Sequence, residues 1–95
     1  MLCVRKEAPF SASDLARHLD TQKIGNRTLF GGNLLRQPAL IQLKQDRPTA
    51  LRVVGNLRGA DKLMQQALFL GTYPGLSKSM MEYEIEVISD FVRRQ

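Results

Sequence analysis

The clearest pattern in the sequence is a helical repeat of apolar residues near its C-terminal end. Apolar residues recur there at intervals of three and four, the spacing of one helix face. The stripe consists of Met80, Met81, Ile85, Val87, Ile88, Phe91 and Val92. Ser77 stands at a suitable N-cap position, and Arg93 and Arg94 lie where cations favour the helix dipole. The pattern predicts a last helix after Ser77 whose stripe, including the Met80–Met81 pair, packs in the core.

Two further helices are predicted from capping and periodicity. Ser11 and Asp14 have the spacing of a capping box, and Gly25 lies shortly beyond the expected helix end. The apolar stripe of this first helix consists of Leu15, Ala16 and Leu19. A second helix is expected over residues 59–68, where the apolar positions are Ala60, Leu63, Met64, Ala67 and Leu68.

Short extended segments separate these helices. Strands or extended pieces are predicted over residues 2–6, 27–30, 51–54 and 68–75, the last ending in a Pro-Gly turn. Residues 33–37 suit one helical turn before Pro38, and the polar residues 42–48 suggest a surface loop. The order predicts an α/β or α+β two-layer domain over residues 1–95, with a short sheet packed against three helices.

The composition excludes several classes of protein. The chain has 95 residues, 43% hydrophobic and 24% charged, which fits one small globular domain with a modest core. The net charge is +5, but the basic residues are dispersed and aromatics are only 6%, so nucleic-acid binding is not expected. No stretch suggests a membrane span or a signal peptide. The single cysteine, Cys3, fits a buried strand position and a reducing, cytoplasmic setting.

A self-contained catalytic or metal site is not predicted. The only histidine, His18, lies beside the apolar stripe of the first helix and suits a surface or boundary position. No histidine-based triad, phosphate-binding loop or dinucleotide fingerprint can be assembled from the sequence. Acidic residues do not pair at metal-ligand spacing, so neither catalytic nor metal residues are assigned.

The stretch FGGNLLRQP, residues 30–38, has an unusual mixture of glycines, leucines and polar residues. Gly31 and Gly32 allow positive φ and a close approach of the backbone to a ligand. Asn33 offers an amide, and Arg27 and Arg36 offer planar groups that fit phosphate or carboxylate. The other interpretation is a tight turn with a capping Asn33 and two solvated arginines. The residues alone leave both interpretations open.

Three segments together resemble a known enzyme family. KIGNRTLFGGNLLRQPA (residues 23–39), RVVGNL (52–57) and LFLGTYPGLS (68–77) are similar to the C-terminal segment of CDP-4-keto-6-deoxy-D-glucose 3-dehydrases. These enzymes of lipopolysaccharide (O-antigen) deoxysugar biosynthesis belong to the DegT/DnrJ/EryC1/StrS aminotransferase family. The resemblance spans nearly the whole chain, although Asn26 stands where relatives are expected to carry threonine.

The resemblance implies the small C-terminal domain of a fold type I pyridoxal-phosphate-dependent transferase. The family's dehydrases use pyridoxamine phosphate and an iron–sulfur cluster to remove the C3 hydroxyl of a nucleotide-linked 4-keto sugar. They form homodimers and work with a flavin iron–sulfur reductase. Cofactor, catalytic histidine and cluster cysteines belong to a large domain that precedes this segment, and neither His18 nor Cys3 matches them. The chain is therefore expected to be a fragment that is inactive alone.

The same resemblance places four residues on the substrate side. They are Arg27, Asn33, Arg36 and Arg52, with Gly31 and Gly32 supplying loop backbone. Arginines suit the two phosphate charges of a nucleotide sugar. Two alternatives remain: the same segment of a sugar-nucleotide aminotransferase, and an autonomous small interaction domain with a closed core.

Overall fold

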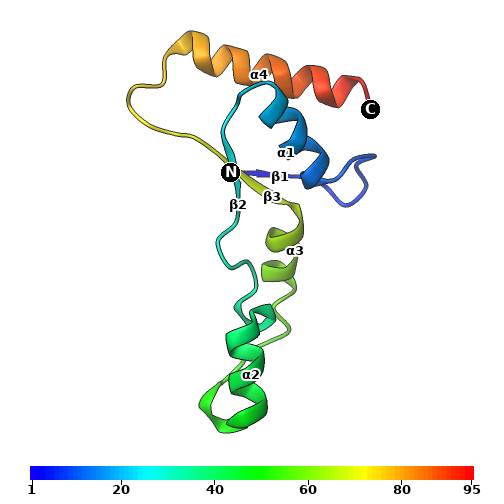
Figure 1. The fold of residues 1–95 in the computed structure, drawn as a ribbon. Coiled ribbons are helices and arrows are strands. Elements are labelled where there is room, and N and C mark those ends of the chain that lie inside the picture. Colours follow the sequence, from blue (N-terminus) through cyan, green and yellow to red (C-terminus); the bar gives the residue numbers. More distant parts are fainter.

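A computed structural model describes all 95 residues. Four helices and a three-stranded sheet make up a small domain of mixed α and β structure (Figure 1). In chain order the elements are β1 (Leu2–Cys3), α1 (Ala12–Thr21), β2 (Asn26–Thr28), α2 (Pro38–Asp46), α3 (Arg58–Gln66), β3 (Ala67–Leu70) and α4 (Lys78–Arg93). Two short 3-10 helices, η1 (Leu34–Arg36) and η2 (Pro48–Ala50), flank α2.

The sheet is antiparallel and has β3 at its centre. Leu2 of β1 pairs with Leu68, and Arg27 of β2 pairs with Phe69 on the other side. The backbone N–H of Val4 also donates to the carbonyl of Gln66 at 2.8 Å, which extends the attachment of β1 beyond the formal strand. The strand predicted at the N-terminus is therefore present and pairs with β3, although all three strands are shorter than expected.

A small core lies where α1 and α4 meet the sheet. Leu19 and Leu68 are the largest fully buried side chains. The buried cluster consists of Val4, Ala12, Leu15, Leu19, Ile24, Leu68 and Val87. Phe10 and Phe91 pack edge to face beside it, with ring centroids 5.0 Å apart. The core thus joins the first 24 residues to the last helix.

Local hydrogen bonds explain where α1 begins and how it is held. The Ser11 hydroxyl accepts from the Asp14 N–H at 3.1 Å, and Asp14 Oδ2 accepts from the Ser11 N–H at 2.9 Å. This is the predicted capping box, and the Ser11 hydrogen bonds hold the pKa of Asp14 below its usual value. At the other end, Asn26 Nδ2 donates to Asp20 Oδ1 at 2.7 Å and thereby ties β2 to α1.

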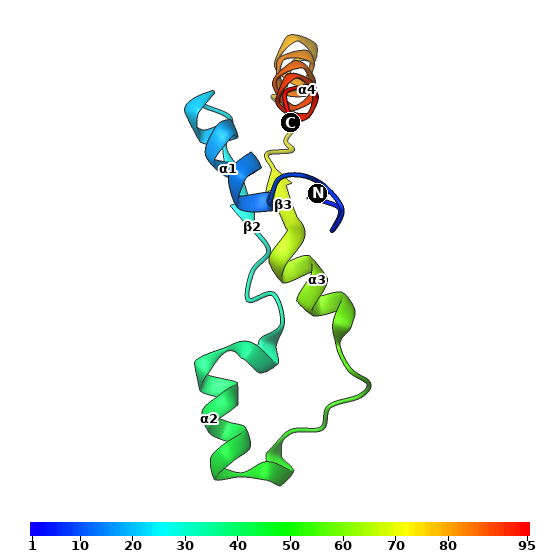
Figure 2. The ribbon, with the colours of Figure 1, turned by 90° about the vertical axis from the view of Figure 1, so that its right-hand side faces the viewer.

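Residues 30–57 form an arm that projects from the core. Figures 1 and 2 show α2 at the far end of this arm, in green, away from α1 and α4. The helix α2 packs against η1 and η2 within the arm itself. The molecule measures 52 × 32 × 21 Å, and its Cα radius of gyration of 17.0 Å exceeds the roughly 12 Å expected for a compact domain of this length.

The helix α2 overturns the prediction of a surface loop over residues 42–48. Pro38 occupies the first helical position, where its fixed φ and missing N–H are tolerated, so the helix begins there rather than ending before it. The helix raises the number of α-helices from the predicted three to four. Residues 51–54, predicted to be extended, belong to no strand of the sheet.

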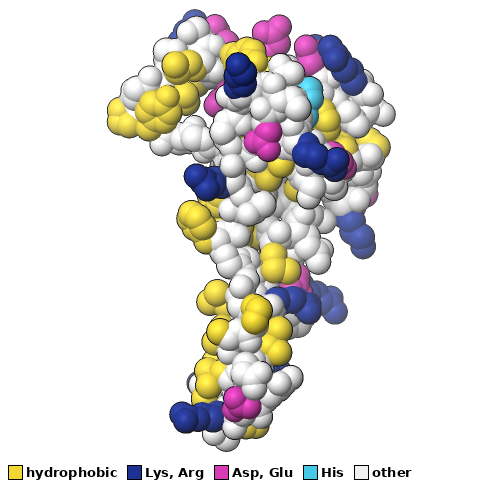
Figure 3. Space-filling model, in the orientation of Figure 1, with side chains coloured by type: hydrophobic (Ala, Val, Ile, Leu, Met, Phe, Trp, Pro, Cys, Tyr) yellow, Lys and Arg dark blue, Asp and Glu magenta, His cyan; other side chains and the backbone are white.

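The predicted burial of the last stripe and of Cys3 is also wrong in part. Val87 is buried and Ile88 and Phe91 pack against the core, but Met80 and Met81 are 49% and 43% exposed. The reason is that α4 packs against α1 with only part of its apolar surface. Cys3 is exposed because side chains alternate between the two faces of a strand, and its neighbours Leu2 and Val4 occupy the face toward the core. Figure 3 shows further hydrophobic side chains at the surface along the arm.

Candidate functional site

The glycine loop at the base of the arm lies directly against α3. Gly31 and Gly32 have φ values of +59° and +58°, in the left-handed region that favours glycine. A Cβ atom added to Gly32 would lie 2.5 Å from Met64 Cβ and 2.9 Å from Met64 Sδ. The backbone at Gly32 therefore approaches Met64 of the same chain, and the approach to a ligand that the sequence suggested stays a prediction.

Asn33 fastens the loop to α3 by a buried side-chain hydrogen bond. Its side chain is 4% exposed, and it is the only polar residue in the buried set. Asn33 Nδ2 donates to Asp61 Oδ1 at 2.9 Å, while Asn33 Oδ1 accepts from the Leu35 N–H at 3.1 Å. One amide thus caps η1 and joins it to the first turn of α3, as the capping interpretation expected.

Arg36 completes the same cluster from the end of η1. Its Nε donates to Asp61 Oδ1 at 2.9 Å and its Nη2 donates to Asp61 Oδ2 at 3.0 Å, a bidentate pair. The hydrogen bonds from Arg36 and then Asn33 lower the pKa of Asp61 to about 2. The same pairing raises the pKa of Arg36 above its usual value. We call Asn33, Arg36 and Asp61 the latch.

Asp61 could not be recognised from the sequence pattern as a member of this cluster. The one feature that could have drawn attention to Asp61 is its place in the first turn of α3. A carboxylate there is usually explained by its favourable interaction with the helix dipole, which does not point to a side-chain partner. Its partners stand 25 and 28 positions earlier, so only the fold reveals them. A further bond within the loop, from Gln37 Nε2 to the Gly31 carbonyl at 2.7 Å, closes it.

The four predicted substrate residues do not gather at one place. Asn33 and Arg36 meet at Asp61, as described above. Arg27 lies exposed in β2, and Arg52 lies exposed in the arm after η2. Neither arginine side chain makes an ion pair or a hydrogen bond within the chain. Their assignment to substrate binding remains a prediction.

The residues of this chain do not fit the cofactors implied by the resemblance. An iron–sulfur cluster is held by several cysteine thiolates, and Cys3 is the only cysteine here. No three histidine, cysteine, aspartate or glutamate side chains are placed to hold a metal ion. The His18 ring packs against the Phe91 ring with centroids 4.9 Å apart, a boundary position as expected. No helix has the length and apolar character needed to cross a membrane.

Comparison with known proteins reveals two informative relatives. The chain is 40% identical over 78 residues to the lipopolysaccharide biosynthesis protein RfbH of Salmonella typhimurium, a match over 82% of the chain. It is 31% identical over 93 residues, or 98% of its length, to a dTDP-4-dehydro-2,6-dideoxy-D-glucose 3-dehydratase of Saccharopolyspora spinosa. The chain is a relative of these deoxysugar and lipopolysaccharide biosynthesis proteins. No protein-family model matches it.

These matches confirm the resemblance found in the sequence and show how much of each relative the chain covers. The aligned region covers 16% of RfbH and 19% of the 3-dehydratase. The chain therefore spans less than a fifth of the length of either relative. The glycine loop and the three latch residues lie inside the region similar to the 3-dehydratase, because that match covers nearly the whole chain.

Proposed function

We propose that this chain is the small-domain segment of a pyridoxamine-phosphate-dependent dehydrase. The reaction is removal of the C3 hydroxyl from a nucleotide-linked 4-keto-6-deoxy sugar, in the deoxysugar branch of lipopolysaccharide biosynthesis in the cytoplasm. The observation that carries the proposal is the similarity to a nucleotide-sugar 3-dehydratase along 98% of the chain. The segment corresponds to the C-terminal small domain of a fold type I transferase.

The open shape of the chain supports a role inside a larger assembly. Its accessible surface of 7473 Å² is about 2,000 Å² more than a compact protein of 10.7 kDa exposes. A standard protein interface takes about 800 Å² from each partner, so the surplus is ample for one. An autonomous interaction domain would need a closed core, and only 9 of the 95 residues are buried here.

The chain's own contribution would be binding and orientation of the substrate. Arg27, Arg36 and Arg52 would contact the nucleotide sugar from separate positions, and the loop backbone at Gly31 and Gly32 would border the sugar. Arg36 can serve both roles, because Asp61 occupies its Nε and Nη2 while Nη1 remains available and the side chain is 61% exposed. Asn33, committed to the latch, would position this loop.

The cofactors belong to the proposed large domain, since the donor set of this chain does not fit them. When bound there, pyridoxamine phosphate and the iron–sulfur cluster would supply the electron-withdrawing and electron-transfer chemistry. The assembly would be a homodimer that receives electrons from a flavin iron–sulfur reductase. This chain supplies no catalytic residue.

The test is reconstitution of activity from separate parts. The purified chain is titrated with a CDP-linked 4-keto-6-deoxy sugar and pyridoxamine phosphate, alone and mixed with the large domain of RfbH expressed without its own matching segment. We expect loss of the C3 hydroxyl only in the mixture. Transfer of an amino group in the mixture would instead indicate a sugar aminotransferase. No reaction from a folded chain that binds the large domain would contradict both assignments.

A further inference from the structure

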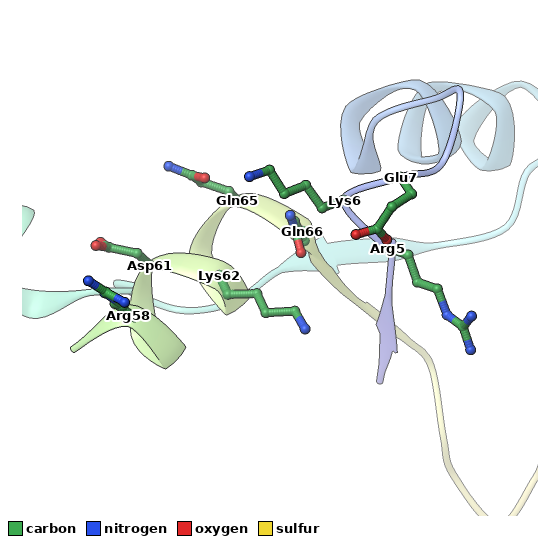
Figure 4. A pocket seen from close by; sticks show the side chains of 8 residues that line it. All are labelled: Arg5, Lys6, Glu7, Arg58, Asp61, Lys62, Gln65 and Gln66. Atoms are coloured by element: carbon green, nitrogen blue, oxygen red, sulfur yellow. The ribbon is translucent and has the colours of Figure 1, made fainter. Parts of the chain in front are cut away.

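A hollow lined only by polar and charged residues lies between the turn after β1 and the exposed face of α3. Its volume is about 670 Å³, and none of its eight lining residues is hydrophobic. Figure 4 shows these side chains: Arg5, Lys6, Glu7, Arg58, Asp61, Lys62, Gln65 and Gln66. Lys6 extends from the turn toward α3, and Lys62 extends from α3 toward the side of β1.

The charge of this hollow is positive and largely unneutralised. Arg5, Lys6, Arg58 and Lys62 form no ion pair within the chain. Of the two carboxylates that line it, Asp61 is already paired with Arg36, which leaves Glu7 as the one free anion. The remaining excess of cations suits a ligand with two or more negative charges.

Gln66 adds a second and independent feature. Its side-chain oxygen Oε1 is buried and has no hydrogen-bond partner. Its backbone is fixed, because the Gln66 carbonyl accepts from the Val4 N–H at 2.8 Å. Leaving a buried amide oxygen unpartnered is unfavourable by about 1–3 kcal/mol, so rotation of this side chain into the hollow, where a ligand hydroxyl could donate to it, would relieve that cost. Glutamine at this position therefore suits a ligand that carries hydroxyls as well as charge.

We propose that this hollow binds the phosphate-bearing part of the nucleotide sugar. The cations would pair with the diphosphate, and Gln66 Oε1 would accept from a sugar or ribose hydroxyl. This inference rests on the proposed function and adds further residues that would contact its substrate. The hollow lies beside the latch, because Asp61 belongs to both. An acidic peptide would also pair with the cations, but a peptide usually presents apolar side chains as well, and this lining has no apolar residue to receive them.

The charge of the hollow is tested with a matched pair of double variants. Binding of inorganic pyrophosphate, CDP and dTDP is measured by calorimetry, and the contacted residues are mapped by amide shifts in NMR. R58Q/K62Q removes two cations from the hollow, while K44Q/R47Q removes the same charge from the end of the arm. Both pairs are exposed and free of ion pairs, so the fold is expected to persist. R58Q/K62Q should weaken binding at least about tenfold, and K44Q/R47Q less than about twofold.

The hydroxyl acceptor is tested by Gln66→Met, which keeps the length of the side chain and removes its polar atoms. Binding of CDP-sugar should weaken several-fold while binding of pyrophosphate stays unchanged. Gln65→Met, next to it and exposed, is the control and should alter neither. Equal weakening by the two variants would overturn the role of Gln66.

The outcomes separate this site from the proposed function. Binding of pyrophosphate at Arg58 and Lys62 without activity in the reconstituted enzyme would support the site and contradict the function. Activity with an unchanged KM in R58Q/K62Q would support the function and overturn the site. Equal losses in the two double variants, or preference for a polyglutamate peptide over CDP, would also overturn it.

Discussion

Asn33 donates a 2.9 Å hydrogen bond to Asp61, a residue 28 positions later in the chain. Asp61 also accepts hydrogen bonds from Nε and Nη2 of Arg36, so a single carboxylate in the first turn of α3 holds the base of the arm. Met64, one turn further along α3, faces the Gly32 backbone. These contacts fix where the arm leaves the core, and they set the position from which it would reach a substrate.

Removing the carboxylate of Asp61 should release the arm without unfolding the core. In Asp61→Asn, Arg36 loses its ionic partner, and the amide retains only part of the acceptor capacity. Amide hydrogen exchange over residues 31–37 should become several-fold faster, while the core strand β3 stays protected. Asp46→Asn makes the same charge change on α2 and serves as the control. Equal exchange in the two variants would contradict the role of the latch.

The latch should also open in acid. Because the pKa of Asp61 is lowered from 3.8 to about 2 in the folded chain, its stabilising effect is complete above the ordinary value and is lost as the pH falls through about 2. We expect the NMR signals of the Asn33 side-chain amide to move with an apparent pKa near 2. In Asp61→Asn this transition should be absent. A transition near 4 would show that Arg36 does not pair with Asp61 in solution.

Two glycines near the latch should respond to alanine in opposite directions. Gly32→Ala places a Cβ against Met64 at a residue with φ of +58°, which should destabilise the chain by about 1–3 kcal/mol. Gly59 lies in the first turn of α3 with open space at its Cβ position, so Gly59→Ala should be neutral or stabilise by up to about 1 kcal/mol. Urea unfolding followed by circular dichroism measures the free energy of unfolding of both variants. Equal losses of stability in Gly59→Ala and Gly32→Ala would argue against a close approach of the Gly32 backbone to Met64.

The exposed apolar side chains should matter for assembly rather than for folding. Phe30 and Ile85 are 86% and 65% exposed, so Phe30→Ser and Ile85→Ser should change the stability of the chain by less than about 0.5 kcal/mol. If the large domain covers them, each change should weaken its affinity for the chain by about tenfold or more. Gln45→Ser, an exposed polar control, should have no effect. Unchanged affinity in both apolar variants would place the large domain on another surface.

A buried leucine should contribute far more to stability than an exposed one. Leu19 is completely buried between α1 and the sheet, and Leu19→Ala should destabilise the chain by about 2–4 kcal/mol. Because only a small core is present, this loss should abolish cooperative unfolding of the isolated chain. Leu34→Ala, at an exposed position in η1, removes the same atoms and should leave the unfolding midpoint nearly unchanged.

Much of the local structure could be predicted because it depends on neighbouring residues. Ser11 and Asp14 form the capping box three residues apart, and Ser77 caps α4 as its position suggests. The glycine pair needed positive φ, and both glycines have it. The failures have an equally clear cause: α2 lacks a strong apolar stripe, and the polar residues 42–48 therefore gave no periodic signal for a helix.

The capped helices and the glycine loop follow from short-range chemistry, and the relationship to deoxysugar biosynthesis proteins follows from similarity between chains, so all three could be read from the sequence. The partners of the loop residues, in contrast, depend on the fold. It joined Asn33 and Arg36 to Asp61, left Arg27 and Arg52 outside that cluster, and brought Lys6 and Lys62 to one hollow. Such pairings join residues 25 or more positions apart, and the period of a pattern carries no information about partners at that distance.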